Sequence, residues 1–163
     1  MKTLILMRHA KSDWTSGIDS DHARPLNPRG RASALALGDW LRDKSWLPDE
    51  VLCSSALRTR ETFEGLGLEA PVRFLDVLYH AGPEVMQETL KAAQGDAVLL
   101  IGHNPGIAEF ARLLLAAAPR HGRFRDYPTG ATLIARFPLD TWSALRWGIG
   151  EAAAFVVPRE LTE

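Results

Sequence analysis

Residues 97–117 read AVLLIGHNPGIAEFARLLLAA, an apolar run that stops at a histidine and then resumes at helical spacing. Ala97–Gly102 has the unbroken apolar composition of a strand that is buried on both faces of a parallel sheet. Pro105–Ala117 predicts an apolar helix, because proline favours the first helical turn and apolar residues follow at helical intervals. The stretch is therefore one strand–helix unit, with His103 and Asn104 directly after the strand.

The same alternation of strand and helix runs along the rest of the chain. Asn27 and Pro28 form a helix-start signal, since asparagine is a favoured N-cap and proline suits the first helical position. The order predicts an α/β fold with a largely parallel sheet, in one domain over residues 1–163. We expect helices at 27–46, 56–66 and 83–94, and strands at 2–7, 50–54, 72–75, 131–137 and 144–149, the last two as a hairpin at the sheet edge.

The composition argues against several classes of protein. Apolar residues make up 46% of the chain and charged residues 24%, which is the balance of an ordinary globular domain in water. A formal net charge of -1 gives no reason to expect nucleic acid or an anionic membrane as a partner. No run of about 18 apolar residues occurs, so we expect no membrane span and a cytoplasmic location. The lone cysteine, Cys53, excludes an internal disulfide.

Neither a metal nor a nucleotide cofactor is expected. The histidines and the cysteine do not occur at HxH, HxxxH or CxxC spacing, which are typical of metal sites. The segment GHNPG at 102–106 lacks the GxxxxGK[ST] pattern of an ATP-binding loop. The segment RHGRFRDYP, Arg120–Pro128, is basic and aromatic but short. We interpret it as a solvated loop rather than a nucleic-acid site, with docking of an acidic protein partner as the alternative.

Three of the predicted strands end in polar side chains that suit anion chemistry. Because the carboxyl ends of parallel strands lie at one edge of a sheet, we expect these side chains to form one pocket. Two arginines and two histidines supply many hydrogen-bond donors and no negative charge, which suits a dianionic phosphoryl group. In chain order, the residues are Arg8 and His9, then Ser54 and Ser55 leading to Arg58, and finally His103 and Asn104.

Such a pocket can also transfer a phosphoryl group. A histidine accepts phosphate only when its attacking nitrogen is neutral, and nearby arginines lower a histidine pKa because they disfavour a second positive charge. The same arginines stabilise the charge on the phosphoryl oxygens in the transition state. We therefore expect phosphoryl transfer to a histidine, here His9, followed by attack of water.

Five segments resemble the histidine phosphatase superfamily, the phosphoglycerate-mutase-like proteins. The segments LILMRHAKS, SSALRTRET and LLIGHNPG resemble its three signatures. The segments RPLNPRGRASA and FVVPREL are similar to its small SixA-type branch of phosphohistidine phosphatases. The resemblance implies a three-layer α/β/α sandwich around a mostly parallel central sheet, with no metal or other cofactor.

The resemblance also implies roles for individual residues. His9 would be the phospho-accepting nucleophile, Arg8 and Arg58 the phosphate-binding arginines, and His103 the second pocket histidine. Ser12 and Asn104 are further phosphate-binding candidates. Ala10 replaces the glycine that the family commonly has after the nucleophile, a small change where the backbone φ is negative.

No residue matches the general acid of the larger family members. The segment FLDVLYHAGPEVM offers Asp76, His80 and Glu84, of which His80 and Glu84 are candidates for an acid or a pocket wall. An alkoxide leaving group needs a proton donor, whereas an imidazole is readily protonated near neutral pH. The missing acid therefore favours phosphohistidine in a protein as the substrate.

Three readings of function stay open at this point. The first is a phosphohistidine phosphatase acting on a phosphorylated protein, and the second is a phosphatase of small phosphate monoesters. The third is a phosphate-recognition module without turnover, which the missing acid supports and the retained nucleophile His9 opposes. We expect Trp14 to form a pocket wall, and His22 and His121 to be exposed or in loops.

Overall fold

The parallel strands β1 (Lys2–Arg8), β4 (Ala97–Gly102) and β2 (Glu50–Ser54) form the centre of a six-stranded sheet. The computed structural model describes residues 1–15, 17 and 20–162. The strand order is β3-β2-β4-β1-β5-β6, with β3 (Val72–Leu75) parallel to β2. The strands β5 (Thr132–Phe137) and β6 (Glu151–Val156) form an antiparallel hairpin that pairs with β1 through β5. The predicted mostly parallel α/β sheet is confirmed.

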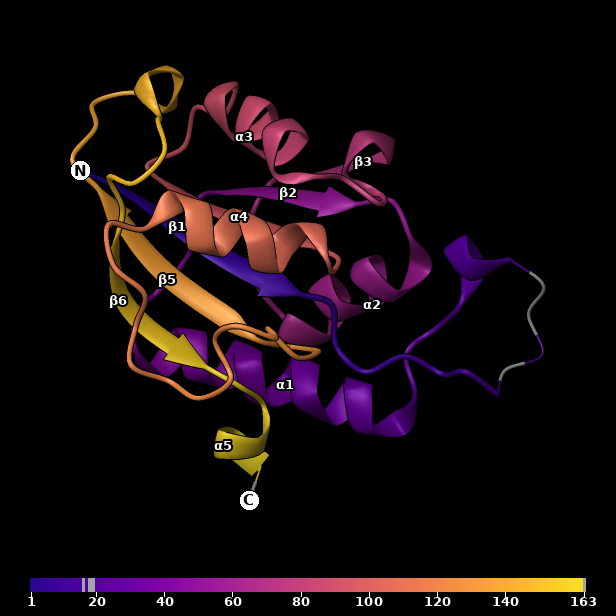
Figure 1. Cartoon of the computed structure of the whole chain (residues 1–163). Helices are drawn as coiled ribbons and strands as arrows, with labels where there is room; N and C mark the ends of the chain where they lie inside the picture. The colour runs from indigo at the N-terminus through magenta and orange to yellow at the C-terminus, as the bar shows by residue number, and fades with distance from the viewer. Residues whose placement is uncertain (16, 18–19, 163) are drawn as a thin grey trace.

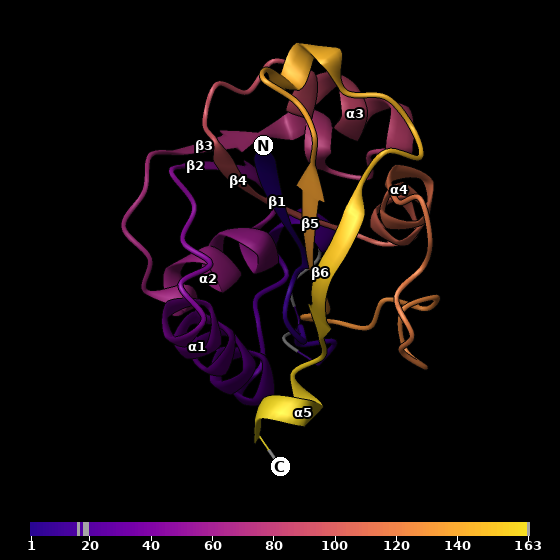
Figure 2. The same cartoon turned by 90° about the vertical axis from the view of Figure 1, so that its left-hand side faces the viewer.

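Helices cover both faces of this sheet, which gives the predicted three layers (Figures 1 and 2). One face carries α1 (Pro28–Asp43) and α2 (Leu57–Leu66), and the other carries α3 (Pro83–Lys91) and α4 (Gly106–Leu114). Short 3₁₀ turns, η1 (Asp21–Ala23), η2 (Asp76–Leu78) and η3 (Trp142–Ala144), lie in the connections, and α5 (Arg159–Thr162) ends the described chain. No helix of the described residues is long and apolar enough to cross a membrane.

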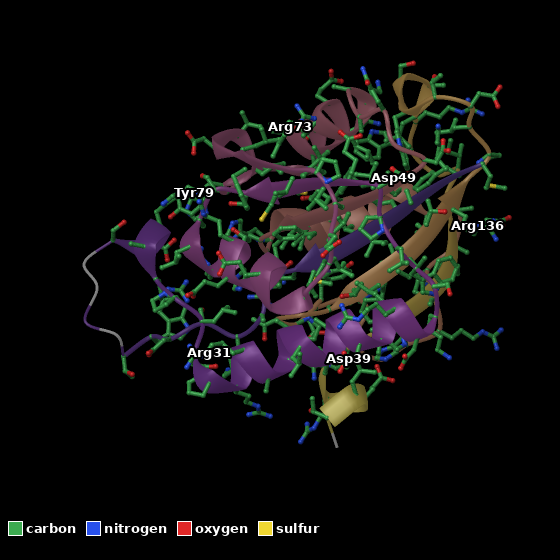
Figure 3. All side chains as sticks on the ribbon, turned by 180° about the vertical axis from the view of Figure 1, so that it is seen from behind. Arg31, Asp39, Asp49, Arg73, Tyr79 and Arg136 are labelled. Atoms are coloured by element: carbon green, nitrogen blue, oxygen red, sulfur yellow. The ribbon has the colours of Figure 1, made fainter. Side chains whose placement is uncertain are left out.

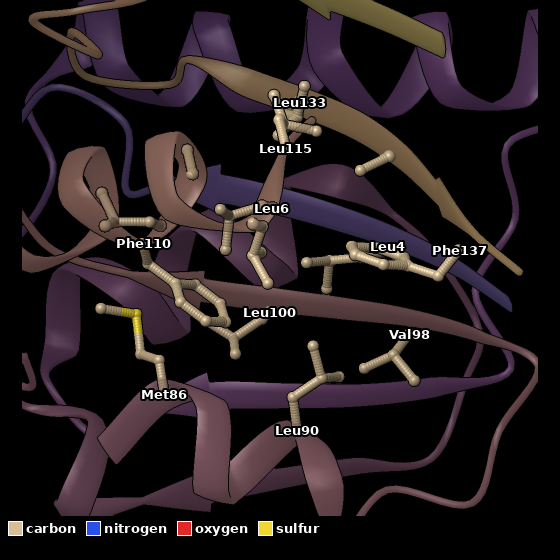
Figure 4. Packing of buried hydrophobic residues seen from close by; sticks show 14 of the residues in the cluster. Leu4, Leu6, Met86, Leu90, Val98, Leu100, Phe110, Leu115, Leu133 and Phe137 are labelled. Carbon is tan, nitrogen blue, oxygen red and sulfur yellow. The ribbon is translucent and has the colours of Figure 1, made fainter. Parts of the chain in front are cut away.

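Each central strand contributes to two hydrophobic cores, because successive side chains of a strand point to opposite faces. In β1, Leu4 and Leu6 pack with α3 and α4, as Figure 4 shows, whereas Ile5 and Met7 pack with α1 and α2. All four side chains are fully buried. The apolar composition of residues 4–7 in β1 and of the whole of β4 follows from this burial on both faces.

Three predicted helices end earlier than expected, and at two of these ends a neighbouring group takes over the backbone hydrogen bonds. The helix predicted to Gln94 ends at Lys91, since the Glu50 carboxylate accepts hydrogen bonds from the N–H groups of Gln94 and Gly95. The helix predicted to Ala117 ends at Leu114, where Gly150 pairs with the chain. The helix predicted over 27–46 spans Pro28–Asp43, and the Asn27 side chain caps it by accepting from the N–H of Gly30 at 2.8 Å.

The prediction of a strand at Ala144–Ile149 is wrong. Its apolar residues belong to η3 and the following loop, where Trp142 and Leu145 are buried in the core. The edge strand is instead β6, whose sequence EAAAFV is rich in alanine and has only one β-branched residue, Val156, so its composition does not favour a strand. The hairpin prediction is correct for its first strand and places the second strand too early in the chain.

Candidate active site

The parallel register brings the ends of β1 and β4 together. Arg8 is paired with Gly102, and the N–H of His9 donates to the Gly102 carbonyl at 3.1 Å. His103 follows Gly102 directly, so it lies beside His9. On the other side of β4, Cys53 is paired with Ile101, which places Ser54 next to His103.

The two histidine rings lie 5.3 Å apart between their centres, at an interplanar angle of 52°. Both residues are buried, with exposed fractions of 5% for His9 and 4% for His103. Arg58, on the first turn of α2, is also buried. The positive charges of Arg8 and Arg58 are close enough to lower the pKa of both histidines. The structure thus brings together the four side chains that the strand ends predicted.

The backbone sets the tautomer of His9. Its Nδ1 lies 2.7 Å from the Ala10 carbonyl oxygen. A carbonyl can only accept, so Nδ1 carries the hydrogen and Nε2 keeps its lone pair. Burial lowers the pKa of His9 well below its ordinary value, and the nearby charges of Arg8 and Arg58 lower this pKa further. His9 therefore presents a neutral Nε2.

His103 is held through its other ring nitrogen. Its Nε2 lies 2.7 Å from the Ser54 hydroxyl oxygen, and its Nδ1 is buried without a hydrogen-bond partner. Burial lowers the pKa of His103 to about 3, and the charges of Arg58 and His80 contribute to this shift. His103 is thus neutral near pH 7, and Nδ1 is the ring atom that remains for a bound group.

Unpaired buried nitrogens are concentrated at this site. Buried polar atoms in proteins nearly always have partners, so the exceptions call for an explanation. An oxyanion placed among these groups would supply the missing acceptors, because guanidinium N–H groups only donate. Among the described residues, the buried side-chain nitrogens and oxygens without a partner are Nε of Arg8, Arg24 and Arg58 and Nδ1 of His103.

Asp21 organises one side of the pocket and was not singled out from the sequence. Arg58 Nη1 donates to its backbone carbonyl at 2.8 Å, and Arg58 Nη2 donates to its carboxylate at 3.1 Å. The Tyr79 hydroxyl donates to the same carboxylate at 2.6 Å, and Arg24 donates to its second oxygen at 3.1 Å. The hydrogen bond from Tyr79 and the two arginines hold the pKa of Asp21 well below its usual range. Asp21 is therefore an ionised anchor for Arg58.

Arg24 links Asp21 to the loop after β1. Its Nη1 donates to the Ser12 hydroxyl, and its guanidinium lies 3.6 Å from the ring centre of Trp14. Trp14 is 77% exposed and covers Arg24 from outside. The spacing of Asp21 and Arg24, an i,i+3 pair, was visible in the sequence, but its connection to Arg58 depends on the path of the loop.

Two aromatic residues complete the rim. The Tyr79 and His80 rings lie 3.9 Å apart, and His80 lies 6.2 Å from His103 between ring centres. His22 was expected to be an exposed or loop residue, but it is half-buried beside the pocket. Its Nε2 lies 3.0 Å from the Ser55 hydroxyl, and its ring packs edge-on against Tyr79. Figure 3 shows Tyr79 at the end of the sheet opposite Arg136.

The weaker sequence candidates fall into two groups. Ser12 is buried beside Arg24, and its hydroxyl hydrogen remains a donor. The Asn104 side chain instead connects α4 to the loop before β5. Its amide donates to the carbonyls of Asp126 and Tyr127 at 2.9 and 3.0 Å, and its oxygen accepts from the N–H of Ala108. The Asn104 side chain thus has no free donor for phosphate. Glu84 is exposed at the start of α3 and is not brought to the two histidines by any described contact.

The remaining histidine, His121, lies outside this pocket. His121 lies 2.8 Å from the Glu160 carboxylate and packs edge-on against Phe155. In the part of the chain that the structure describes, no three His, Cys, Asp or Glu side chains are grouped as metal ligands.

Comparisons with known proteins point to one family. Residues 4–81 match the model of the histidine phosphatase superfamily (branch 1). An uncharacterized protein of Mycobacterium tuberculosis is 37% identical over 161 residues, which cover 94% of this chain and 100% of the relative. A candidate phosphohistidine phosphatase SixA from Nakamurella multipartitia has a solved structure with a TM-score of 0.86 and 32% identity, covering 96% of both chains.

A more distant structure has the same fold. The protein histidine phosphatase SixA complexed with tungstate has a TM-score of 0.80 at 23% identity, over 98% of this chain and 99% of that one. The chain therefore belongs to the histidine phosphatase superfamily, in its SixA-type branch, with a phosphoglycerate-mutase-like fold.

Proposed function

We propose that this protein is a phosphatase that transfers a phosphoryl group to His9 and then to water, with phosphohistidine in a protein as its substrate. The observation that carries the proposal is the hydrogen bond between His9 Nδ1 and the Ala10 carbonyl, which leaves Nε2 as a neutral nucleophile. Arg8, Arg58 and His103 surround it with unpaired buried nitrogens that suit the phosphoryl oxygens. Two similar solved structures, from Nakamurella multipartitia and Agrobacterium tumefaciens, are of candidate phosphohistidine phosphatases, which supports the substrate class.

The reaction proceeds in two displacements. The lone pair of His9 Nε2 attacks phosphorus, the P–N bond of the substrate breaks, and the released imidazole takes up a proton. Water then attacks the phosphorus on His9, the P–Nε2 bond breaks, and phosphate leaves with neutral His9 restored. Arg8 and Arg58 lower the barrier of both steps, because they neutralise charge on the equatorial oxygens.

The carboxylate nearest to this chemistry in the hydrogen-bond network is unsuited to act as a proton donor. Asp21 is held ionised by Tyr79, Arg24 and Arg58, and a depressed pKa makes a carboxyl group a poor general acid. A phosphohistidine leaves as an imidazole and does not need such a donor. The open rim, where Trp14 is 77% exposed and the His80 side chain 64%, suits a side chain presented by another protein.

One observation favours the alternative of a small phosphate monoester as substrate. The exposed His80 ring lies 6.2 Å from His103, where it could protonate an alkoxide that leaves the pocket. A monoesterase that used His80 would lose activity on alkyl phosphates when His80 is replaced. It would keep activity on aryl phosphates, whose leaving groups need no proton.

The proposal is tested with two substrates and one variant. Wild type should release phosphate from both an aryl phosphate and a phosphohistidine protein, with the higher kcat/KM for the phosphohistidine protein. His9→Ala should abolish both activities. A large preference for a sugar phosphate would favour the monoesterase, and equal aryl phosphate rates for wild type and His9→Ala would favour a recognition module without turnover.

A further inference from the structure

A cavity borders the loop that carries His9, because Lys11 of this loop is part of its lining. It has a volume of about 280 Å³ and is formed by the first turn of α1, the residues before β5 and the C-terminal helix α5. Its polar lining comes from four cationic residues, Lys11, Arg29, Arg123 and Arg159, and from three hydroxyl residues, Ser33, Thr129 and Thr162. Figures 1 and 2 show α5 beside α1 on the side of the molecule away from α3.

This cavity is positively charged. Its described lining contains four cationic residues and no aspartate or glutamate. Two of these four cations already have partners, since Arg123 pairs with Asp126 at 2.9 Å and Arg159 interacts with another group. The Glu160 carboxylate on the adjoining helix lies 2.8 Å from His121. Lys11 and Arg29 are exposed and form no ion pair within the described part of the chain. Their charge is therefore available to an anionic partner.

The cavity shares its wall with the catalytic loop. Lys11 follows His9 by two residues, so their Cα atoms are at most about 7 Å apart. The Lys11 carbonyl accepts from the N–H of Asn27 at 3.1 Å, and the N–H of Gly130 donates to the His9 carbonyl at 2.9 Å. These bonds fix the cavity wall relative to the loop that carries the nucleophile.

We propose that this cavity binds acidic side chains next to the phosphorylated residue of the protein substrate; this inference rests on the proposed function. Lys11 and Arg29 would pair with the carboxylates, and the hydroxyls of Ser33 and Thr129 can donate to them. The volume is slightly below the range of pockets for drug-sized ligands and suits a carboxylate side chain. The exposed positions of Lys11 and Arg29 suit a polypeptide that approaches from solvent rather than an enclosed small anion.

The test uses two synthetic phosphohistidine peptides that differ only in flanking glutamates or glutamines. At low salt, wild type should hydrolyse the glutamate peptide with about tenfold higher kcat/KM, since two exposed charge pairs each contribute modestly. The double variant Lys11→Glu/Arg29→Glu should lose this preference and keep its aryl phosphate activity. The matched control Arg136→Glu, an exposed arginine of β5 at the far end of the sheet, should keep the preference (Figure 3).

A binding measurement separates this inference from the proposed function. Fluorescence anisotropy with the unphosphorylated glutamate peptide should give a Kd that rises at least about fivefold in the double variant but not in Arg136→Glu. Hydrolysis of aryl phosphate but of neither phosphohistidine peptide would reject the proposed substrate, and the binding data would still decide the role of the cavity. Equal Kd values for wild type and the double variant, or equal and measurable turnover of the two peptides by wild type, would overturn the inference.

Discussion

Arg58 donates two hydrogen bonds to Asp21, from Nη1 to the backbone carbonyl at 2.8 Å and from Nη2 to the carboxylate at 3.1 Å. This double contact fixes the guanidinium plane while Nε stays unpaired and buried. Arg58 is thus oriented before any phosphoryl group binds. Orientation of this kind reduces the reorganisation needed in the transition state.

Replacement of Asp21 should lower activity through Arg58. Asp21→Asn keeps the backbone carbonyl and the shape of the side chain but removes the charge that aligns Arg58. We expect kcat/KM for an aryl phosphate to fall about 10- to 100-fold, because small misplacements of a catalytic group have effects of this size. Inhibition by tungstate should weaken in parallel. Tyr79→Phe, which removes only one hydrogen bond to Asp21, should have a smaller effect, and unchanged tungstate inhibition in Asp21→Asn would contradict the assignment.

Ser54 should matter far more than its neighbour Ser55. Ser54→Ala leaves Nε2 of the buried His103 without its partner at 2.7 Å. An unsatisfied buried polar group costs about 1–3 kcal/mol, so the free energy of unfolding should fall by that amount. Ser55→Ala removes only the contact with His22 and is the matched control. Urea denaturation of both variants measures the difference, and equal losses would show that the Ser54–His103 contact is unimportant.

The protein should lose stability as the pH falls below about 6.5. The folded pKa of His103 is about 3, whereas an unfolded histidine titrates near 6.5. A depressed folded pKa gives stability that is complete above the unfolded pKa and is lost as the pH falls toward the folded pKa. His103 alone should contribute a loss of about 2 kcal/mol between pH 7.5 and pH 5. Denaturation curves at these pH values should show that His103→Gln loses less unfolding free energy than wild type. An identical dependence of the unfolding free energy on pH in the two proteins would contradict the lowered pKa of His103.

Gly30 should be essential for the position of the catalytic loop. A Cβ at Gly30 would lie 2.0 Å from the Lys11 carbonyl oxygen, a backbone atom that can move only with the loop. Gly30→Ala should therefore destabilise the protein by about 1–3 kcal/mol or more and lower activity at His9. Gly122→Ala, where a Cβ meets nothing within 4 Å, should leave both unchanged. Full activity and stability of Gly30→Ala would show that α1 adapts to the added methyl group.

The sequence allowed the core of the site to be predicted because it depends on strand ends. His9 and His103 each follow an apolar strand, and a parallel sheet brings such ends to one edge whatever the loops do. Asp21 and Tyr79 could not be predicted in the same way. Their contact depends on how the loop after β1 folds toward η2, and no local pattern records that path. Asn104 was predicted to bind phosphate because it directly follows a strand end. Its side chain instead accepts a hydrogen bond from the N–H of Ala108 in α4 and donates one to the carbonyl of Tyr127.

The fold could be predicted where burial dictates composition. The strands β2 and β4 agree with the predicted bounds, since apolar runs between turn signals are characteristic of buried parallel strands. The bounds of the partly buried edge strand β3 also agree. The strand β6 lies at the sheet edge, is only partly buried, and has an alanine-rich sequence that does not favour a strand. Pairing with β5 determines its structure, and pairing across the sheet is a long-range effect.

The central claim is that His9 carries the phosphoryl group, and trapping the phosphorylated protein tests it most directly. Wild type mixed with a phosphohistidine protein and quenched within milliseconds should carry acid-labile, base-stable phosphate on the peptide that contains His9, attached through Nε2, and His9→Ala should carry none. Phosphate on another residue, or full phosphatase activity in His9→Ala, would contradict the account.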